Sequence, residues 1–184
     1  MRRAFIVVLL LLIFPPAEAT EAGWALLREG EQVVLLRHAM APGAAEPARF
    51  KIEDCGTQRN LSDRGQQQAR KIGALFLARA APTERVLSSR YCRALETAHL
   101  AFGDNDPEPM EALDLLSTDE KTAAAQNKAV IDEIRAYSGS GNLILITHQE
   151  NIKALTGAAA REGEAIIVRA TEQGLDVVGR IIFN

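Results

Sequence analysis

Two patterns of apolar positions divide this chain into expected strands and helices. Continuous apolar runs are typical of strands that are buried on both faces of a sheet. They predict strands at 32–36, 85–89 and 143–147. Apolar residues spaced three or four positions apart mark one face of a helix. This spacing predicts helices at 63–80, 92–103, 119–137 and 150–158.

The remaining segments complete an alternating order of strands and helices. Ser62 is a good N-cap for the first predicted helix, whose apolar face carries Ala69, Ile72 and Phe76. Near the C-terminus, "EAIIVRA" and "LDVVGRIIF" are joined by "TEQG" and predict a hairpin. Because strands and helices alternate through most of the chain, we expect a three-layer α/β/α sandwich with a mostly parallel central sheet.

A long segment at 40–60 has no predicted strand or helix of its own and contains proline and glycine. Loops of this length inside a compact domain are usually functional. We therefore expect this loop, together with residues 103–120, to shape ligand specificity.

The N-terminal segment has the three parts of a signal peptide. Arg2 and Arg3 precede an apolar run at 4–14, and "AEA" at 17–19 provides small residues for cleavage. A transmembrane anchor is the alternative, but this run is well short of the roughly 20 residues that a spanning helix needs. We therefore expect residues 1–19 to be a signal peptide and residues 20–184 to form a single domain. The mature protein would be secreted or periplasmic, with no stable membrane span.

Composition fits one globular domain and argues against nucleic acid as a partner. The chain has 184 residues, of which 47% are hydrophobic, enough for a sizeable core. Its formal net charge is −3, and it carries no basic tail or acidic block, so nucleic-acid binding has little support. Nothing in the pattern indicates an oligomeric state.

The chain contains two cysteines, Cys55 and Cys92. Export to an oxidising compartment favours a disulfide between them, and two free buried thiols are the alternative. A bridge would tie the loop at 40–60 to the helix that begins near residue 92.

Polar residues follow all three predicted internal strands. Arg37 and His38 come after the first strand, "RYCR" follows the second, and His148 follows the third. If these strands are parallel, two histidines and at least one arginine meet at one sheet edge, where open α/β sheets bind ligands. Taken singly, each has an ordinary interpretation as a structural histidine or a surface cation. Together they indicate an anion site, because arginine binds phosphate oxygens in a bidentate manner and helix N-termini add N–H donors.

Four segments also match family motifs in the same order. They are "LRHA" at 36–39, "RNLSDRG" at 59–65, "SRYCRALETA" at 89–98 and "ILITHQENI" at 144–152. The first resembles an RHG signature, the second R-x-L-[ST]-x-x-G, and the third S-x-x-x-R-A-x-x-T-A. The fourth is similar to an apolar strand that ends in a second histidine. These are motifs of the histidine phosphatase superfamily, which has the phosphoglycerate mutase-like fold, and the resemblance covers residues 32–158.

The resemblance implies a role for each matching residue. His38 is the implied nucleophile, which forms a phosphohistidine, and His148 is the implied second histidine. Arg37 and Arg93 are the implied phosphate clamps. A neutral imidazole, with an ordinary pKa of about 6.5, is a competent nucleophile near neutral pH. Phosphoryl transfer mainly needs positioning and charge neutralisation, which these residues supply, so we expect no metal and no cofactor.

Other polar residues of these motifs have less defined roles. Arg59 and Asn60 are candidates to reach the phosphate from the loop, although a loop cation is often solvated. Arg90 precedes the motif arginine, and we expect it outside the pocket or on its rim. His99 lies within a predicted helix, where we expect a structural role.

The chain departs from the family pattern at two points. Ala39 replaces the signature glycine, which is tolerated unless the backbone φ is positive there. The second point is the acid that protonates the leaving group, for which we favour Glu150 over Asp114. A carboxylate at the start of a helix has an ordinary explanation in the helix dipole. Other carboxylates in the middle of the chain are Glu111 and Asp119.

The sequence therefore predicts a metal-independent phosphatase that hydrolyses a small phosphomonoester, or a phosphoramidate, through a phosphohistidine on His38. The alternatives are a catalytically weak protein that binds phosphate or a phosphosugar, and a phosphomutase of the same fold. A cysteine phosphatase is excluded, because neither Cys55 nor Cys92 has an arginine at the offset that this chemistry needs. A metal-dependent phosphatase has little support, because no paired metal-ligand motif is present.

Overall fold

The computed structural model describes residues 16–183, so the predicted apolar signal run lies outside the described residues. The helices are α1 (Pro16–Glu29), α2 (Asp63–Ala78), α3 (Cys92–Phe102), α4 (Glu120–Ala136) and α5 (Gln149–Thr156). The strands are β1 (Val33–Arg37), β2 (Thr83–Ser88), β3 (Glu108–Pro109), β4 (Asn142–Thr147), β5 (Ala165–Ala170) and β6 (Leu175–Ile181). Short 3-10 helices are η1 (Cys55–Thr57), η2 (Gly103–Asn105) and η3 (Glu111–Leu113).

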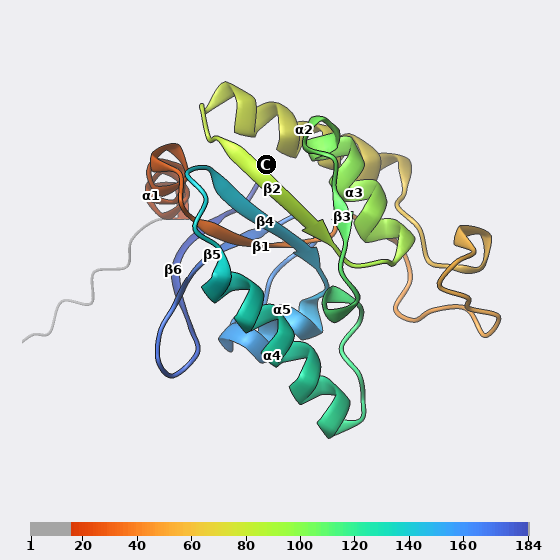
Figure 1. The fold of residues 1–184 in the computed structure, drawn as a ribbon. Coiled ribbons are helices and arrows are strands. Elements are labelled where there is room, and N and C mark those ends of the chain that lie inside the picture. Colours follow the sequence, from red (N-terminus) through yellow and green to blue (C-terminus); the bar gives the residue numbers. More distant parts are fainter. Residues whose placement is uncertain (1–15, 184) are drawn as a thin grey trace, which may run out of the picture.

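One sheet contains all of these strands, in the order β3-β2-β4-β1-β5-β6 (Figure 1). Strands β3, β2, β4 and β1 are parallel, whereas β5 and β6 form the antiparallel hairpin predicted from the sequence. Strand β4 lies between β2 and β1, and its Leu145 pairs with both Leu87 and Leu35. The C-terminal ends of these three strands therefore lie side by side.

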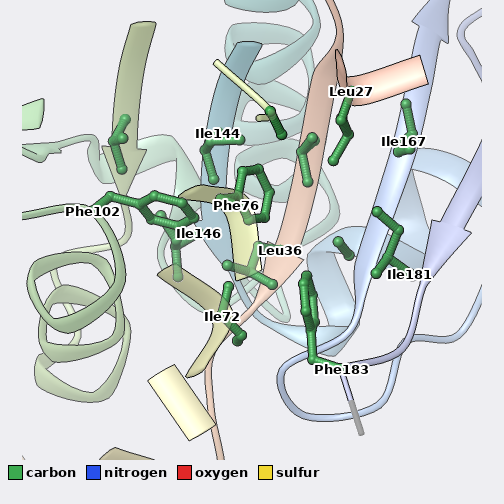
Figure 2. Close-up of a cluster of buried hydrophobic side chains, with 14 of the residues drawn as sticks. Leu27, Leu36, Ile72, Phe76, Phe102, Ile144, Ile146, Ile167, Ile181 and Phe183 are labelled. Carbon is green, nitrogen blue, oxygen red and sulfur yellow. The ribbon is translucent and has the colours of Figure 1, made fainter. Parts of the chain in front are cut away.

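Helices cover both faces of the sheet, which confirms the three-layer sandwich (Figure 1). On one face, α1, α2 and α3 contribute to a core that includes Leu27, Phe76 and Phe102 (Figure 2). The Phe76 ring meets the rings of Trp24 and Phe102 edge-on, at centroid distances of 5.4 and 5.1 Å. On the other face, α4 and α5 pack against the sheet.

Strand β4 explains why the apolar runs of this sequence are continuous. All of its residues are buried, and successive side chains point into different cores. Ile144 and Ile146 belong to the core under α2 and α3, whereas Leu143 and Leu145 belong to the core under α4 and α5. Each fully buried side chain of this size stabilises the fold by about 1.5–3 kcal/mol. The strand that His148 directly follows is therefore firmly anchored in both cores.

The N-terminus of α2 is fixed close to the chain that follows β1. The Ser62 hydroxyl accepts a hydrogen bond from the Gly65 N–H at 3.1 Å, so Ser62 is the helix cap that the sequence predicts. The Ser62 N–H donates to the Met40 carbonyl at 3.1 Å. A Cβ atom on Gly65 would lie 2.0 Å from that same carbonyl oxygen, so only glycine permits this approach. These contacts hold in place the segment that follows His38 in the chain.

One α-helix and one strand were not predicted from the sequence. Helix α1 packs against β6, where a Cβ atom on Gly23 would lie 2.8 Å from Ile181 Cγ1. Its buried residues Trp24 and Leu27 lie after the predicted cleavage position at Ala19. Strand β3 has only two residues and pairs with the end of β2. Both elements are stabilised by residues distant in the sequence, which local periodicity does not reveal.

The helices within residues 16–183 are all too short or too polar to span a lipid bilayer.

Candidate active site

Three adjacent parallel strands bring polar residues to one edge of the sheet. His38 follows β1, Ser89 follows β2, and His148 follows β4. Backbone bonds extend the sheet past the strand ends, because His38 N–H donates to the Thr147 carbonyl at 3.0 Å and Ser89 N–H donates to the Ile146 carbonyl at 2.9 Å. The two imidazole rings lie 5.4 Å apart, centroid to centroid. The strand ends that carry the histidines meet as the sequence indicated.

Arg93, in the first turn of α3, connects the two histidines. Its Nε–H donates to His38 Nε2 at 3.1 Å, and its Nη2 donates to His148 Nδ1 at 3.2 Å. Its guanidinium carbon lies 4.8 Å from the centre of the Tyr91 ring, which adds a cation–π contact. Arg93 is 1% exposed, so the charge of this side chain is held inside the protein.

The hydrogen-bond partners determine which imidazole nitrogens carry protons. His38 Nδ1 lies 2.8 Å from the Ala39 carbonyl, which can only accept, so this nitrogen is the donor. His38 Nε2 therefore keeps its lone pair, which faces Arg93. His148 Nδ1 accepts from Arg93, so His148 Nε2 is the nitrogen that donates to the Ser89 hydroxyl at 2.9 Å. Ser89 in turn donates to Asp114 Oδ1 at 3.1 Å.

Both imidazoles are held in the neutral form. The pKa of His38 is lowered to about 3, chiefly by burial; the Ala39 carbonyl opposes this shift, and the charges of Arg93, Arg37 and Arg59 add to it. Burial also lowers the pKa of His148 well below its ordinary value, with Arg93 adding to the effect. A neutral imidazole whose Nε2 is unprotonated can act as a nucleophile near neutral pH.

The neighbourhood of Ala39 is compatible with its side chain. Its N–H donates to Thr97 Oγ1 at 3.0 Å, and the residue is fully buried. The described residues with a positive φ that are not glycine are Glu31, Ala80 and Asp106, so Ala39 does not need the backbone freedom of glycine.

A cavity of about 790 Å³ opens over the two histidines, and several cations line it. Arg37 donates to the Ala160 carbonyl at 2.9 Å and to Gln149 Oε1, and it lies 3.7 Å from Glu162. Its buried Nε has no hydrogen-bond partner, which leaves a donor for an anion. Other charged residues that line the cavity are Glu46, Arg59, Arg93, Glu150 and Arg161. A wall with this many guanidinium groups suits a phosphate-sized anion.

The structure separates Arg59 from Asn60. Arg59 lines the cavity, where its Nη1 donates to the carbonyls of Ala41, at 3.2 Å, and of Gly43. Asn60 is not part of the cavity wall, because its Nδ2 donates to the Cys55 carbonyl at 2.6 Å. Of these two loop residues, only Arg59 is placed to meet a ligand.

The carboxylates that the sequence offers as the proton donor lie at different positions relative to the cavity. Glu150 lines the cavity but is exposed, in the first turn of α5. Asp114 lies outside the cavity wall, where it accepts from the Arg90 N–H at 2.7 Å and from Arg90 Nε at 2.8 Å. Arg90 also pairs with Glu111 at 3.0 Å, so it lies outside the cavity as expected. Asp119 caps α4 by accepting from the Thr122 N–H.

Glu46 contacts the site, and the sequence analysis did not identify it. Its Oε1 accepts from Arg93 Nη1 at 2.6 Å, and its Oε2 accepts from the Arg59 N–H at 3.0 Å. Burial lowers the pKa of Arg93, and the Glu46 carboxylate opposes this shift. The loop contains other acidic residues, such as Glu53, and no spacing pattern distinguishes Glu46 from them.

A disulfide fixes the loop that carries Glu46. Cys55 and Cys92 are bonded, with a Cα–Cα distance of 5.7 Å. Beside this bond, the Cys92 N–H donates to Gln58 Oε1 at 2.9 Å. Because Cys92 directly precedes Arg93, the bridge attaches the loop to the turn of α3 that holds the two histidines.

The residues described by the structure contain no group of three or more His, Cys, Asp or Glu side chains that could hold a metal ion. His99 is exposed on α3 and takes no part in the site.

A sequence model of one protein family, the histidine phosphatase superfamily (branch 1), matches residues 33–120. This range includes Arg37, His38 and Arg93. No curated protein matches the sequence.

Solved structures of this fold are similar to the chain at low sequence identity. The protein histidine phosphatase SixA, complexed with tungstate, is 20% identical with a TM-score of 0.56, over 82% of this chain and 96% of that one. Phosphoglycerate mutase from Thermus thermophilus is 19% identical with a TM-score of 0.58, over 83% and 99%. Phosphoserine phosphatase from Entamoeba histolytica, in complex with 3-phosphoglyceric acid, is 13% identical with a TM-score of 0.58, over 82% and 96%. These shared folds show that the chain has the phosphoglycerate mutase-like fold, and the family model is similar to the chain over residues 33–120.

Proposed function

We propose that this protein is a metal-independent phosphatase that hydrolyses a small phosphomonoester, or a phosphoramidate, through a phosphohistidine on His38. The observation that carries this proposal is the Nε2 lone pair of a neutral, buried His38 beside the donors of Arg93. The solved structures with this fold include phosphatases and a mutase, which supports the general class of reaction.

The site has the groups that the first step needs. His38 Nε2 attacks the phosphorus atom, and the Nδ1–H bond to the Ala39 carbonyl stabilises the positive charge that develops on the ring. Arg93 and Arg37 neutralise the charge on the transferring oxygens, which is the main requirement of phosphoryl transfer. An anion in the cavity favours protonation of His148, which then donates to one of these oxygens.

A mutase is the second candidate, because one of the similar folds is a phosphoglycerate mutase. The two reactions share the phosphohistidine and differ in its acceptor. Water accepts the phosphoryl group in a phosphatase, whereas a second substrate hydroxyl accepts it in a mutase. Release of free phosphate at the same rate as the alcohol identifies the phosphatase.

We also propose that the protein is secreted or periplasmic after cleavage near Ala19. The disulfide between Cys55 and Cys92 supports an oxidising compartment. N-terminal sequencing of the protein from its native host should find Thr20 as the first residue. A mature chain that keeps Met1 in the cytoplasm would contradict this proposal.

Hydrolysis of p-nitrophenyl phosphate tests the activity directly. We expect turnover that is unaffected by EDTA and is abolished by His38→Ala, because no other group replaces the nucleophile. His99→Ala is the matched control, since it removes an exposed imidazole that does not line the cavity. Full activity of His38→Ala would refute the mechanism, and loss of activity in EDTA would refute metal independence. A screen of sugar phosphates, nucleotides and phosphohistidine peptides then identifies the substrate class.

A further inference from the structure

The cavity contains three carboxylates among its described lining residues, and they differ in their contacts. Glu162 is engaged by Arg37 at 3.7 Å and by the Ala41 N–H at 3.3 Å. Glu150 is exposed to solvent. Glu46 bonds directly to Arg93, the residue that contacts both imidazoles. Of the three, Glu46 is therefore the carboxylate most closely connected to the reacting atoms.

Glu46 is held firmly in this position. Its side chain is 16% exposed, and its Oε2 is bound to the Arg59 N–H at 3.0 Å. Arg59 is fixed by the carbonyls of Ala41 and Gly43. The Cys55–Cys92 disulfide anchors the same loop to α3. These contacts together hold the Glu46 carboxyl group against Arg93.

An incoming substrate changes the surroundings of Glu46. Its Oε1 lies 2.6 Å from Arg93 Nη1, while Arg93 Nε lies 3.1 Å from His38 Nε2. A phosphoryl group that reaches His38 must therefore share Arg93 with Glu46. Two anions on one guanidinium repel each other, and the repulsion favours the neutral, protonated form of the carboxyl group. Glu46 therefore lies where a bound phosphoryl group changes the charge around it, next to the guanidinium that both would share.

We propose that Glu46 is the proton donor to the leaving group, a role that rests on the proposed phosphatase function. In the first step, the His38 Nε2–P bond forms, the P–O bond to the alcohol breaks, and the Glu46 proton moves to the alcohol oxygen. In the second step, a water oxygen attacks phosphorus and the N–P bond breaks. Glu46 accepts the proton that this water loses, which restores the acid and releases hydrogen phosphate.

This role makes the effect of Glu46 depend on the leaving group. An alkoxide is a poor leaving group and needs a proton, whereas p-nitrophenolate leaves without one. General acid catalysis contributes about 10²–10⁴-fold to rate. We therefore expect Glu46→Gln to lower kcat for glycerol 2-phosphate by about 10²–10⁴-fold. For p-nitrophenyl phosphate, the same variant should lose less than about tenfold, since only the acid is missing.

Two further variants make the experiment specific. Glu53→Gln is the matched control, because Glu53 is an exposed carboxylate of the same loop that does not line the cavity. Glu46→Asp keeps an acid on a shorter side chain and should recover part of the activity on glycerol 2-phosphate. If Glu46→Gln does not fold, the activity of Glu46→Asp on the two substrates tests the role of Glu46 instead.

Three outcomes would overturn the inference. If Glu46→Gln lowers kcat equally for both substrates, Glu46 only positions Arg93. If Glu46→Gln is as active as the wild type on both substrates, it has no role in turnover. If Glu150→Gln instead shows the dependence on leaving group, Glu150 is the acid. A failure of the phosphatase proposal is distinguishable, because His38→Ala would then match the wild type with either substrate.

Discussion

The buried imidazole of His38 should make the stability of this protein fall as the pH is lowered from 7 to 5. In the folded state the pKa of His38 is lowered to about 3, chiefly by burial. In the unfolded chain an ordinary histidine has a pKa of about 6.5. Between these two values the unfolded state binds a proton that the folded state does not. Stability is therefore lost as the pH falls below about 6.5.

The size of the effect follows from the two pKa values. At pH 5 the unfolded imidazole lies about 1.5 pH units below its pKa, and each unit is worth about 1.4 kcal/mol. His38 should thus contribute about 2 kcal/mol to the loss of stability between pH 7 and pH 5. Other groups titrate in this range, so the relevant quantity is the difference between the wild type and a variant without this imidazole.

Urea unfolding of wild type and His38→Gln, under oxidising conditions, measures that difference. The chain has one tryptophan, Trp24, which is buried in the core and reports on unfolding by its fluorescence. We expect the variant to lose about 2 kcal/mol less than the wild type between pH 7 and pH 5. His99→Gln controls for the removal of an exposed imidazole. Equal losses in wild type and His38→Gln would show that the folded protein accommodates a charged His38, which contradicts the neutral nucleophile.

Three further predictions address the parts that support the site. Replacing both cysteines by serine should lower the free energy of unfolding by about 4 kcal/mol, because the bridge joins residues 37 positions apart; an unchanged urea midpoint would contradict this. Gly73→Ala should destabilise the fold by more than about 1 kcal/mol, because the new Cβ would lie 2.1 Å from the Ala101 carbonyl oxygen; thermal unfolding checks it, and an unchanged melting temperature would refute it. Ser89→Ala should lower kcat more than it raises KM, because Ser89 orients His148; a change in KM alone would indicate a binding role.

Much of the fold could be predicted because the apolar pattern is local. The continuous apolar run of β4 and the spacing of Ile72 and Phe76 in α2 each indicate, from a few neighbouring residues, which side chains are buried. Helix α1 has no such local signal, since its burial depends on Gly23 fitting against β6 at the other end of the chain. The two-residue strand β3 is too short for any periodicity.

The part of the candidate site that the apolar pattern alone predicts consists of residues at strand ends. His38 and His148 lie directly after parallel strands, so the topology alone brings them together. Glu46 reaches Arg93 through an irregular loop whose path depends on the disulfide and on Arg59, and no repeat marks its position. Ser89 belongs to a motif, but its bond to His148 becomes visible only once β2 is seen beside β4.

Rapid-quench trapping of the enzyme intermediate tests directly whether His38 carries the phosphoryl group during turnover. After a few milliseconds with p-nitrophenyl phosphate and a quench in alkali, which preserves phosphohistidine, the protein is digested and analysed by mass spectrometry. We expect a phosphoryl group on the peptide that contains His38, formed at a rate no slower than turnover and absent from His38→Ala. A wild-type enzyme that turns over without any phosphorylated His38 peptide, or one that carries the phosphoryl group on another residue, would contradict it.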